Sequence, residues 1–149
     1  MSAGAAAPDV HVARWRDLDA ETAYAILQLR TTVFVVEQRC AYQDIDGRDR
    51  EEDARQLWIA AQGRVVSTLR LLREQDGSHR IGKVATHASF RGRGFGAALV
   101  AHALQLTDGD VVLNAQAQLT GWYERFGFAV SGAEWVDEGI AHVPMRRLR

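Results

Sequence analysis

The chain has 149 residues, of which 47% are hydrophobic and 25% are charged. These are the fractions of an ordinary globular protein, so a disordered or fibrous chain is excluded, and the length predicts a single domain over residues 1–149. The formal net charge of -1 gives no electrostatic reason to expect binding to nucleic acid or to an anionic membrane.

The N-terminus and the cysteine content bear on the compartment in which the protein works. Residues 1–9 lack the charged and apolar regions of a signal peptide and are expected to form a flexible tail. Cys40 is the only cysteine, so an internal disulfide and a cysteine-based zinc site are excluded. No apolar run approaches the roughly 20 residues that a membrane helix needs. We therefore expect a cytoplasmic protein.

The first third of the chain predicts a strand followed by helical segments. Val10 to Arg16 alternates apolar and polar residues, as a half-buried strand does. Asp19 can cap a helix that runs from Ala20 to about Arg30. A second short helix is expected near Val33 to Gln38, although its β-branched residues disfavour it.

Three consecutive strands are predicted after a polar segment. The acid-rich stretch from Gln43 to Asp53 is expected to be a solvated loop, although its carboxylates could also attract a cationic amine. Leu57 to Ala61 and Val65 to Arg73 are separated by a short turn and predict a hairpin, and Arg80 to Thr86 follows after a second turn.

The last third of the chain predicts a change of architecture. Gly94 to Leu106 has the apolar periodicity of a helix, and Asp110 to Ala115 is a short apolar strand, so that a parallel crossover is expected. Leu119 to Phe126 suits a short helix, and Phe128 to Val130 and Ile140 to Leu148 suit two closing strands. The predicted fold class is therefore mixed α/β, with a largely antiparallel central sheet, one parallel crossover and flanking helices.

A glycine-rich turn between a predicted strand and a predicted helix is the most informative segment. It reads Arg91-Gly92-Arg93-Gly94-Phe95-Gly96. Glycine lets the backbone approach a ligand closely, and a helix start offers unpaired N–H groups, so the turn predicts a site for a phosphate or pyrophosphate. Arg91 and Arg93 add positive charge beside it.

Several interpretations of this turn compete. The string of an ATP-binding P-loop is absent, which excludes that chemistry. Gly92, Gly94 and Ala97 match the spacing of a dinucleotide-binding turn, but too little chain follows for the long parallel sheet of such an oxidoreductase. In addition, the next strand ends in Asn114 rather than in the acid that would bind a ribose. A turn made only for packing is the remaining alternative.

Arg91, Gly94 and Gly96 also form an Arg-x-x-Gly-x-Gly string. This string resembles the acetyl-CoA pyrophosphate loop of the Gcn5-related N-acetyltransferase (GNAT) family. Downstream, Trp122 to Phe128 resembles the Tyr-x-x-x-Gly-Phe segment of that family. The resemblance extends from about Val10 to the C-terminus, because the order of the predicted elements is similar as well.

Three further strings resemble the ElaA-type subfamily more narrowly. They are Val33 to Gln38, Leu113 to Gln116 and Asp137 to His142. The resemblance implies that a bulge splays the strand before the glycine-rich turn away from its neighbour. Ala88 stands where a proline is common in the family.

The resemblance implies a set of residues that bind acetyl-CoA. The backbone of the strand before the turn would pair with the pantetheine arm and polarise the acetyl carbonyl, and the N–H groups of the turn would hold the pyrophosphate. Asn114 could bond the donor or simply end its strand. The implied binding residues are Val84, Ala85, Thr86, Arg91, Gly92, Arg93, Gly94, Phe95, Gly96 and Asn114.

The same resemblance implies direct attack of an amine on the thioester, without an acyl-enzyme. Tyr123 is the candidate general acid, since a phenol is protonated at neutral pH and can protonate a leaving thiolate. Glu37 is the first candidate for the general base, and His87, His142 and a water relay are the alternatives. The histidines show no metal-ligand spacing, so no catalytic metal is expected.

The sequence thus predicts an acetyl-CoA-dependent N-acetyltransferase with a small-molecule or peptide amine as acceptor. The identity of the amine is left open, and a homodimer is one option for the assembly. A module that binds or senses acyl-CoA without catalysis is the alternative, because the strands before the turn lack the glutamate that many family members use as a base.

Overall fold

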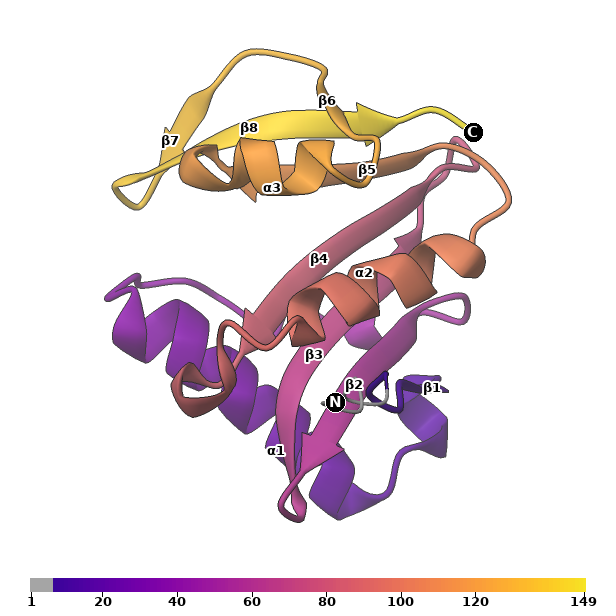
Figure 1. Ribbon diagram of the computed structural model, residues 1–149, viewed down its shortest axis with the longest axis vertical. Coiled ribbons are helices and arrows are strands. Elements are labelled where there is room, and N and C mark those ends of the chain that lie inside the picture. Colours follow the sequence, from indigo (N-terminus) through magenta and orange to yellow (C-terminus); the bar gives the residue numbers. More distant parts are fainter. Residues whose placement is uncertain (1–6) are drawn as a thin grey trace, which may run out of the picture.

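The computed structural model describes residues 7–149 (Figure 1), so most of the tail expected at residues 1–9 lies outside the described residues. The strands are β1 (His11–Ala13), β2 (Arg55–Ala61), β3 (Arg64–Arg73), β4 (His79–Thr86), β5 (Val111–Gln116), β6 (Ala129–Val130), β7 (Trp135–Asp137) and β8 (Ile140–Arg147). The helices are α1 (Ala20–Thr31), α2 (Phe95–Gln105) and α3 (Thr120–Glu124). No helix in the described part of the chain is long and apolar enough to cross a membrane.

The eight strands form one mixed sheet, which confirms the predicted fold class. Its order is β1-β2-β3-β4-β5-β8-β6, and β7 pairs with β8. Every pair is antiparallel except β4 and β5. These two are joined by the crossover through α2, as the strand–helix–strand pattern predicted. Strand β7 was not predicted from the sequence, because all three of its residues are exposed and show no alternation.

Helix α1 begins where the sequence predicts it. The Asp19 carboxylate accepts a hydrogen bond of 2.7 Å from the Thr22 N–H and so caps the helix start. The short helix expected near residues 33–38 is present, but it is a π-helical continuation of α1, from Thr32 to Glu37, rather than a separate element. The β-branched residues disfavour a regular α-helix here, and the wider turn accommodates them.

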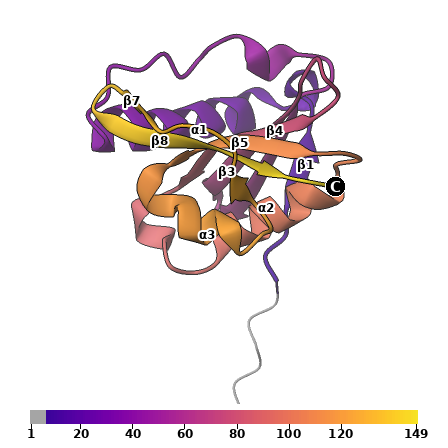
Figure 2. The same cartoon turned by 90° about the horizontal axis from the view of Figure 1, so that it is seen from above.

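The sheet has two different faces. Helices α2 and α3 cover one face, and α1 lies on the other (Figure 2). Leu69, Ile81, Leu99 and Leu113 are among the buried residues that form the main core on the α2/α3 face. Because successive side chains of a strand point to opposite faces, the residues that alternate with this core belong to the α1 face.

Gln43 to Asp53 forms a largely exposed loop, as expected, but Asp44 and Asp49 are exceptions. The side chains of Asp44 and Asp49 are 3% and 6% exposed, and both form ion pairs with Arg30 of α1, at 2.9 and 2.7 Å. Arg30 itself is fully buried. A segment rich in acids is expected to be solvated when no cations are known to pair with it. Here the paired cations come from elements outside the segment, so the composition of the segment does not indicate them.

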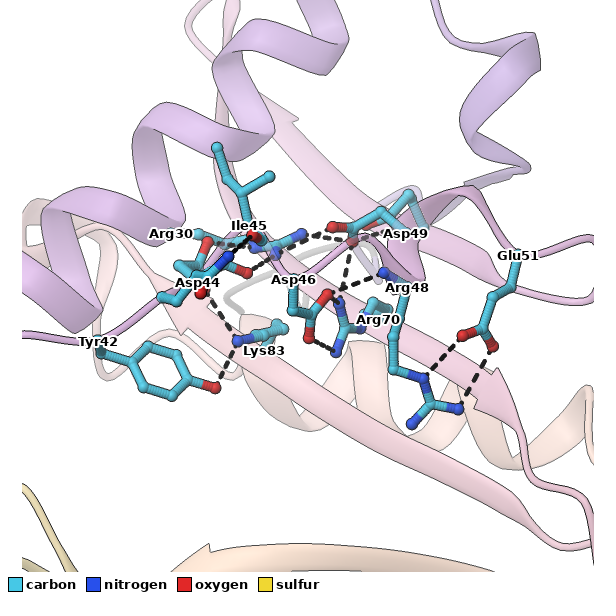
Figure 3. A network of polar contacts seen from close by, with 12 residues as sticks. Arg30, Tyr42, Asp44, Ile45, Asp46, Arg48, Asp49, Glu51, Arg70 and Lys83 are labelled. Carbon is cyan, nitrogen blue, oxygen red and sulfur yellow. Dashed lines mark hydrogen bonds and ion pairs between the residues drawn. The ribbon is translucent and has the colours of Figure 1, made fainter.

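Arg70 of β3 and Lys83 of β4 add two cations from the sheet to these ion pairs. Arg70 donates two hydrogen bonds to Asp46, at 2.8 and 2.9 Å, and Lys83 lies 3.2 Å from Asp44. The buried ion network is therefore the set Arg30, Asp44, Asp46, Asp49, Arg70 and Lys83, and Figure 3 shows how it joins the polar segment to α1 and the sheet.

The network holds the carboxylates of Asp46 and Asp49 in the charged form. Partial burial would raise the pKa of Asp46, but the hydrogen bonds from Arg70 and from the Arg48 N–H outweigh burial and lower that pKa to about 2. Burial likewise opposes ionisation of Asp49, and the hydrogen bond and charge of Arg30 lower its pKa. The segment after α1 is thus attached to the molecule by charge–charge contacts rather than by apolar packing.

Candidate active site

Strands β4 and β5 pair over a short length and then separate. Their parallel pairing is confined to two positions, His79 with Val111 and Arg80 with Val112. Beyond Arg80, the β5-side edge of β4 has no strand partner among residues 7–149. The unpaired N–H and C=O groups of such an edge can pair with an extended ligand.

A β-bulge lies on β4 at the place where the strands separate. Thr68 pairs with Ala85 and Arg70 pairs with Gly82, so β4 contains one residue more than β3 in this interval. Lys83 adopts a positive φ of 53° there. The splayed strand implied by the family resemblance is therefore present in the structure.

A cavity of about 290 Å³ occupies the space between the separated strands. Residues from both faces of the sheet line it. Tyr123 of α3 reaches it from the α2/α3 face. Its lining residues include Phe34, Gln38, Cys40, Tyr42, Arg70, Arg80, Gly82, Lys83, Val84, Leu113, Asn114, Gln116, Tyr123, Trp135, Asp137 and His142.

The glycine-rich turn enters α2 at the C-terminal end of β4. Gly92 and Gly94 have φ values of 77° and 79°, in the left-handed region that favours glycine. Gly94 is the N-cap of α2, and no side chain among the described residues caps this helix start. A Cβ on either glycine would meet no atom within 4 Å. The turn is therefore an open surface of backbone N–H groups, which suits an anion.

The implied CoA-binding residues of β4 occupy different surroundings. Val84 lines the cavity, and Ala85 is buried against Leu29 and Val33 on the α1 face. The Thr86 hydroxyl is hydrogen-bonded to that of Ser67 at 2.8 Å. The side chains of Ala85 and Thr86 are thus engaged within the protein, and the backbone edge of the strand remains available to a ligand.

Arg91 and Glu37 lie together although 54 positions separate them in the chain. Arg91 Nη2 donates a hydrogen bond of 2.6 Å to Glu37 Oε2, and Arg91 Nε donates one of 3.0 Å to the Thr86 carbonyl. Glu37 is not among the residues that line the cavity. The structure therefore places Glu37, the first candidate base, beside the glycine-rich turn, where it is already paired with the Arg91 guanidinium.

The entry to the turn is capped by a histidine. His87 Nδ1 accepts a hydrogen bond of 3.1 Å from the Ser89 N–H, and a short 3-10 turn follows from Ala88 to Phe90. This cap orders the chain where the family commonly has proline. Arg93 then lies over the ring of Phe90, 4.9 Å from its centroid. His87 is outside the cavity lining, as Glu37 is.

Tyr123 is held firmly in the cavity wall. Its ring makes edge-to-face contacts with Trp122 and Phe128, at centroid distances of 4.9 and 6.1 Å. Burial raises the pKa of Tyr123 to about 12. The phenol is therefore protonated throughout the neutral range, as a general acid must be before it reacts.

Several cavity residues were not singled out in the sequence as site residues. Lys83 donates a hydrogen bond of 2.6 Å to the Tyr42 hydroxyl, and its ammonium lies 4.2 Å from the centroid of that ring. Trp135 was interpreted as core or rim packing, and it stacks on His142 in the cavity wall. No local motif marks these residues, since they meet only through the bulge and the β7–β8 hairpin.

Comparisons with known proteins agree with this geometry. A family model described as an acetyltransferase (GNAT) domain matches residues 18–149. The UPF0039 protein Rv2851c of Mycobacterium tuberculosis is 43% identical over 137 residues, which cover 89% of this chain and 88% of the relative. Protein ElaA of Escherichia coli is 37% identical over 145 residues, which cover 89% and 95% of the two chains.

A solved structure extends the similarity to three dimensions. It is described as an acyl-CoA N-acyltransferase from Pseudomonas aeruginosa, and it superposes with a TM-score of 0.89 and 39% identity over 94% of this chain and 99% of that one. The family model, the relatives and the fold agree over most of the length. The chain therefore belongs to the GNAT acetyltransferase family, on its ElaA-like branch.

Proposed function

We propose that this protein transfers an acetyl group from acetyl-CoA to a primary amine, by direct attack on the thioester. The observation that carries the proposal is the continuous path formed by the open glycine-rich turn, the unpaired edge of β4 and the cavity that contains Tyr123. The acyltransferase family to which the chain belongs supports the same reaction.

Successive parts of this path match successive parts of acetyl-CoA, from the pyrophosphate to the acetyl group. The N–H groups from Gly92 to Gly96 would hold the pyrophosphate, and the free edge of β4 from Val84 to Thr86 would pair with the pantetheine arm. A backbone N–H at the bulge would polarise the acetyl carbonyl, which fixed main-chain donors do without reorganising. Tyr123 would protonate the leaving sulfur.

The alternative proposal is a module that binds acyl-CoA without catalysis. It is favoured by one observation. Many family members have a catalytic glutamate on the strands before the turn, and the residues there are the apolar Leu69, Leu71, Ile81 and Val84. The two proposals differ in turnover. Assays of wild-type protein with acetyl-CoA and a panel of amines will detect free thiol from an enzyme and none from a binding module.

The glycine-rich turn supplies the test of the donor site. We expect calorimetry to show binding of acetyl-CoA and CoA but not of NAD, and Gly94→Val to weaken CoA binding roughly 10- to 100-fold, the worth of one or two charge-assisted hydrogen bonds. The valine side chain would cover the N–H groups at the start of α2. With a φ of 79°, valine at this position also costs roughly 1–3 kcal/mol of backbone strain.

Gly77 offers a matched control for this strain. It lies in the β3–β4 turn with a φ of 88°, and a Cβ there meets no atom within 4 Å. Gly77→Val should lose a similar amount of stability in thermal unfolding and keep wild-type affinity for CoA. Equal CoA affinity in the Gly94 and Gly77 variants would remove the turn from the proposed donor site.

Gly82 supplies the test of the acceptor side. It lies on β4 opposite Arg70, on the α1 face, and lines the cavity, and a Cβ at this position would meet no atom within 4 Å. We expect Gly82→Val to fold normally and to raise the KM for the amine roughly tenfold or more, as filling a binding pocket does. CoA affinity should be unchanged. Wild-type KM values for every amine turned over would contradict an acceptor site at this position.

A further inference from the structure

His142 and Tyr123 reach the cavity from opposite faces of the sheet. In the β5–β8 pair, Leu113 lies opposite Met145 and both belong to the core under α2 and α3. Gln116 lies opposite His142, at positions that alternate with this core. The His142 ring therefore belongs to the α1 face, whereas Tyr123 comes from α3 on the other face, and both line the cavity.

Hydrogen bonding fixes which ring nitrogen of His142 is basic. Nδ1 lies 2.9 Å from the carbonyl oxygen of Ile140. A carbonyl only accepts, so Nδ1 carries the proton and the lone pair of the neutral ring is on Nε2. Within the described part of the chain, no residue hydrogen-bonds Nε2. The imidazole is thus an oriented base with its free nitrogen available.

Packing fixes the plane of the same ring. Trp135 of β7 stacks on His142 with a centroid distance of 5.6 Å and an interplanar angle of 21°. Asp137, which follows on the same face of β7, also lines the cavity and supplies a negative charge that favours a cationic amine. The neighbours on β5, Asn114 and Gln116, are uncharged.

Two other ionisable groups that line the cavity, Cys40 and Lys83, do not compete for the role. Burial raises the pKa of the Cys40 thiol, and the carboxylates of Glu138 and Asp137 raise it further, so the thiol stays neutral. Lys83 is committed to Tyr42 and Asp44. The two rival bases, Glu37 and His87, are engaged by Arg91 and by the Ser89 N–H outside the cavity.

We infer that His142 is the general base of the proposed acetyl transfer and accepts a proton from the acceptor amine at Nε2. The inference rests on the proposed function. The amine enters from the α1 face, and His142 removes one proton from its ammonium group. The nitrogen lone pair forms the N–C bond, and the C–S bond breaks.

The two protons that the amine loses are taken up by groups on the two faces of the sheet. Tyr123 gives its proton to the departing sulfur and is restored by the second proton of the amine nitrogen. His142 returns the first proton to solvent. The products are the acetylated amine, the free thiol of CoA and one proton, and no further reactant is needed. Base and acid line the same cavity from the two faces of the sheet, and each is thereby positioned for its own proton transfer.

The inference is tested by kinetics of His142→Gln with acetyl-CoA and the amine that wild type uses best. We expect kcat to fall roughly 100-fold or more, the acid limb of the pH profile of kcat/KM to disappear, and CoA affinity and thermal unfolding to stay as in wild type. Glu37→Gln and His87→Gln serve as matched controls and should keep the acid limb. Added imidazole should partly restore turnover in His142→Gly.

A second measurement needs no substrate. Nitrogen-15 NMR of the free protein should show the neutral ring of His142 protonated at Nδ1, and an Nε2-protonated ring would overturn the inference. An active wild type whose acid limb survives in His142→Gln but is lost in Glu37→Gln would assign the base to Glu37. A wild type that binds CoA but acetylates no amine would overturn the proposed function, and this inference with it.

Discussion

Replacing Tyr123 by phenylalanine is expected to lower kcat roughly 100- to 10,000-fold, the range that a general acid contributes. Burial raises the pKa of Tyr123 to about 12, so the phenol does not ionise on its own at neutral pH. It can give its proton to sulfur as it receives the second proton of the amine, and phenylalanine can do neither. Steady-state kinetics at saturating acetyl-CoA will measure this loss.

The same substitution leaves the fold intact. Phenylalanine keeps the ring contacts with Trp122 and Phe128, so thermal unfolding and CoA affinity should match those of wild type. Tyr24 on α1, which is 70% exposed, offers the matched control, and Tyr24→Phe should have wild-type kcat. A Tyr123→Phe enzyme with full activity would show that water, rather than the phenol, protonates the sulfur.

The second large effect concerns stability rather than turnover. Asp49→Asn is expected to lower the free energy of unfolding by about 3–5 kcal/mol, because removing one partner of a buried ion pair leaves charge without compensation. Asp49 accepts hydrogen bonds from Arg30, Gln56 and Arg70, and an amide of the same shape cannot neutralise two guanidinium groups. Equilibrium unfolding in urea will measure the difference.

Asp53 provides the comparison within the same polar segment. Its side chain is exposed, so Asp53→Asn should change the free energy of unfolding by no more than about 0.5 kcal/mol. If the Asp49 and Asp53 variants were equally stable, Asp49 would contribute no more to the polar segment than a solvated side chain does. The buried ion network would then contribute nothing to holding it.

The parts of the fold that the sequence predicted are those that depend on local pattern. The cap at Asp19, the β2–β3 hairpin and the crossover through α2 each follow from neighbouring residues, and the structure confirms them. The family resemblance added the bulge on β4, which no periodicity indicates. The assignment of CoA-binding and catalytic roles stays a prediction.

The parts that could not be predicted depend on contacts between distant residues. Arg30 meets Asp49 across 19 positions, and Arg91 meets Glu37 across 54. Composition alone makes a run of acids look solvated and makes a carboxylate near a helix end look available as a base. Only the folded chain shows that Asp44 and Asp49 are buried against arginine and that Glu37 is paired with one.

The contacts of Lys83 have a consequence for an enzyme that acetylates amines. Lys83 is the only lysine in the chain, and its side chain is 6% exposed, with its ammonium held between Tyr42 and Asp44. An ammonium nitrogen held by these two contacts is a poor nucleophile. In the proposed reaction the protein would therefore present almost no lysine amine of its own to compete with the acceptor, and it would be protected from modification by the acetyl donor.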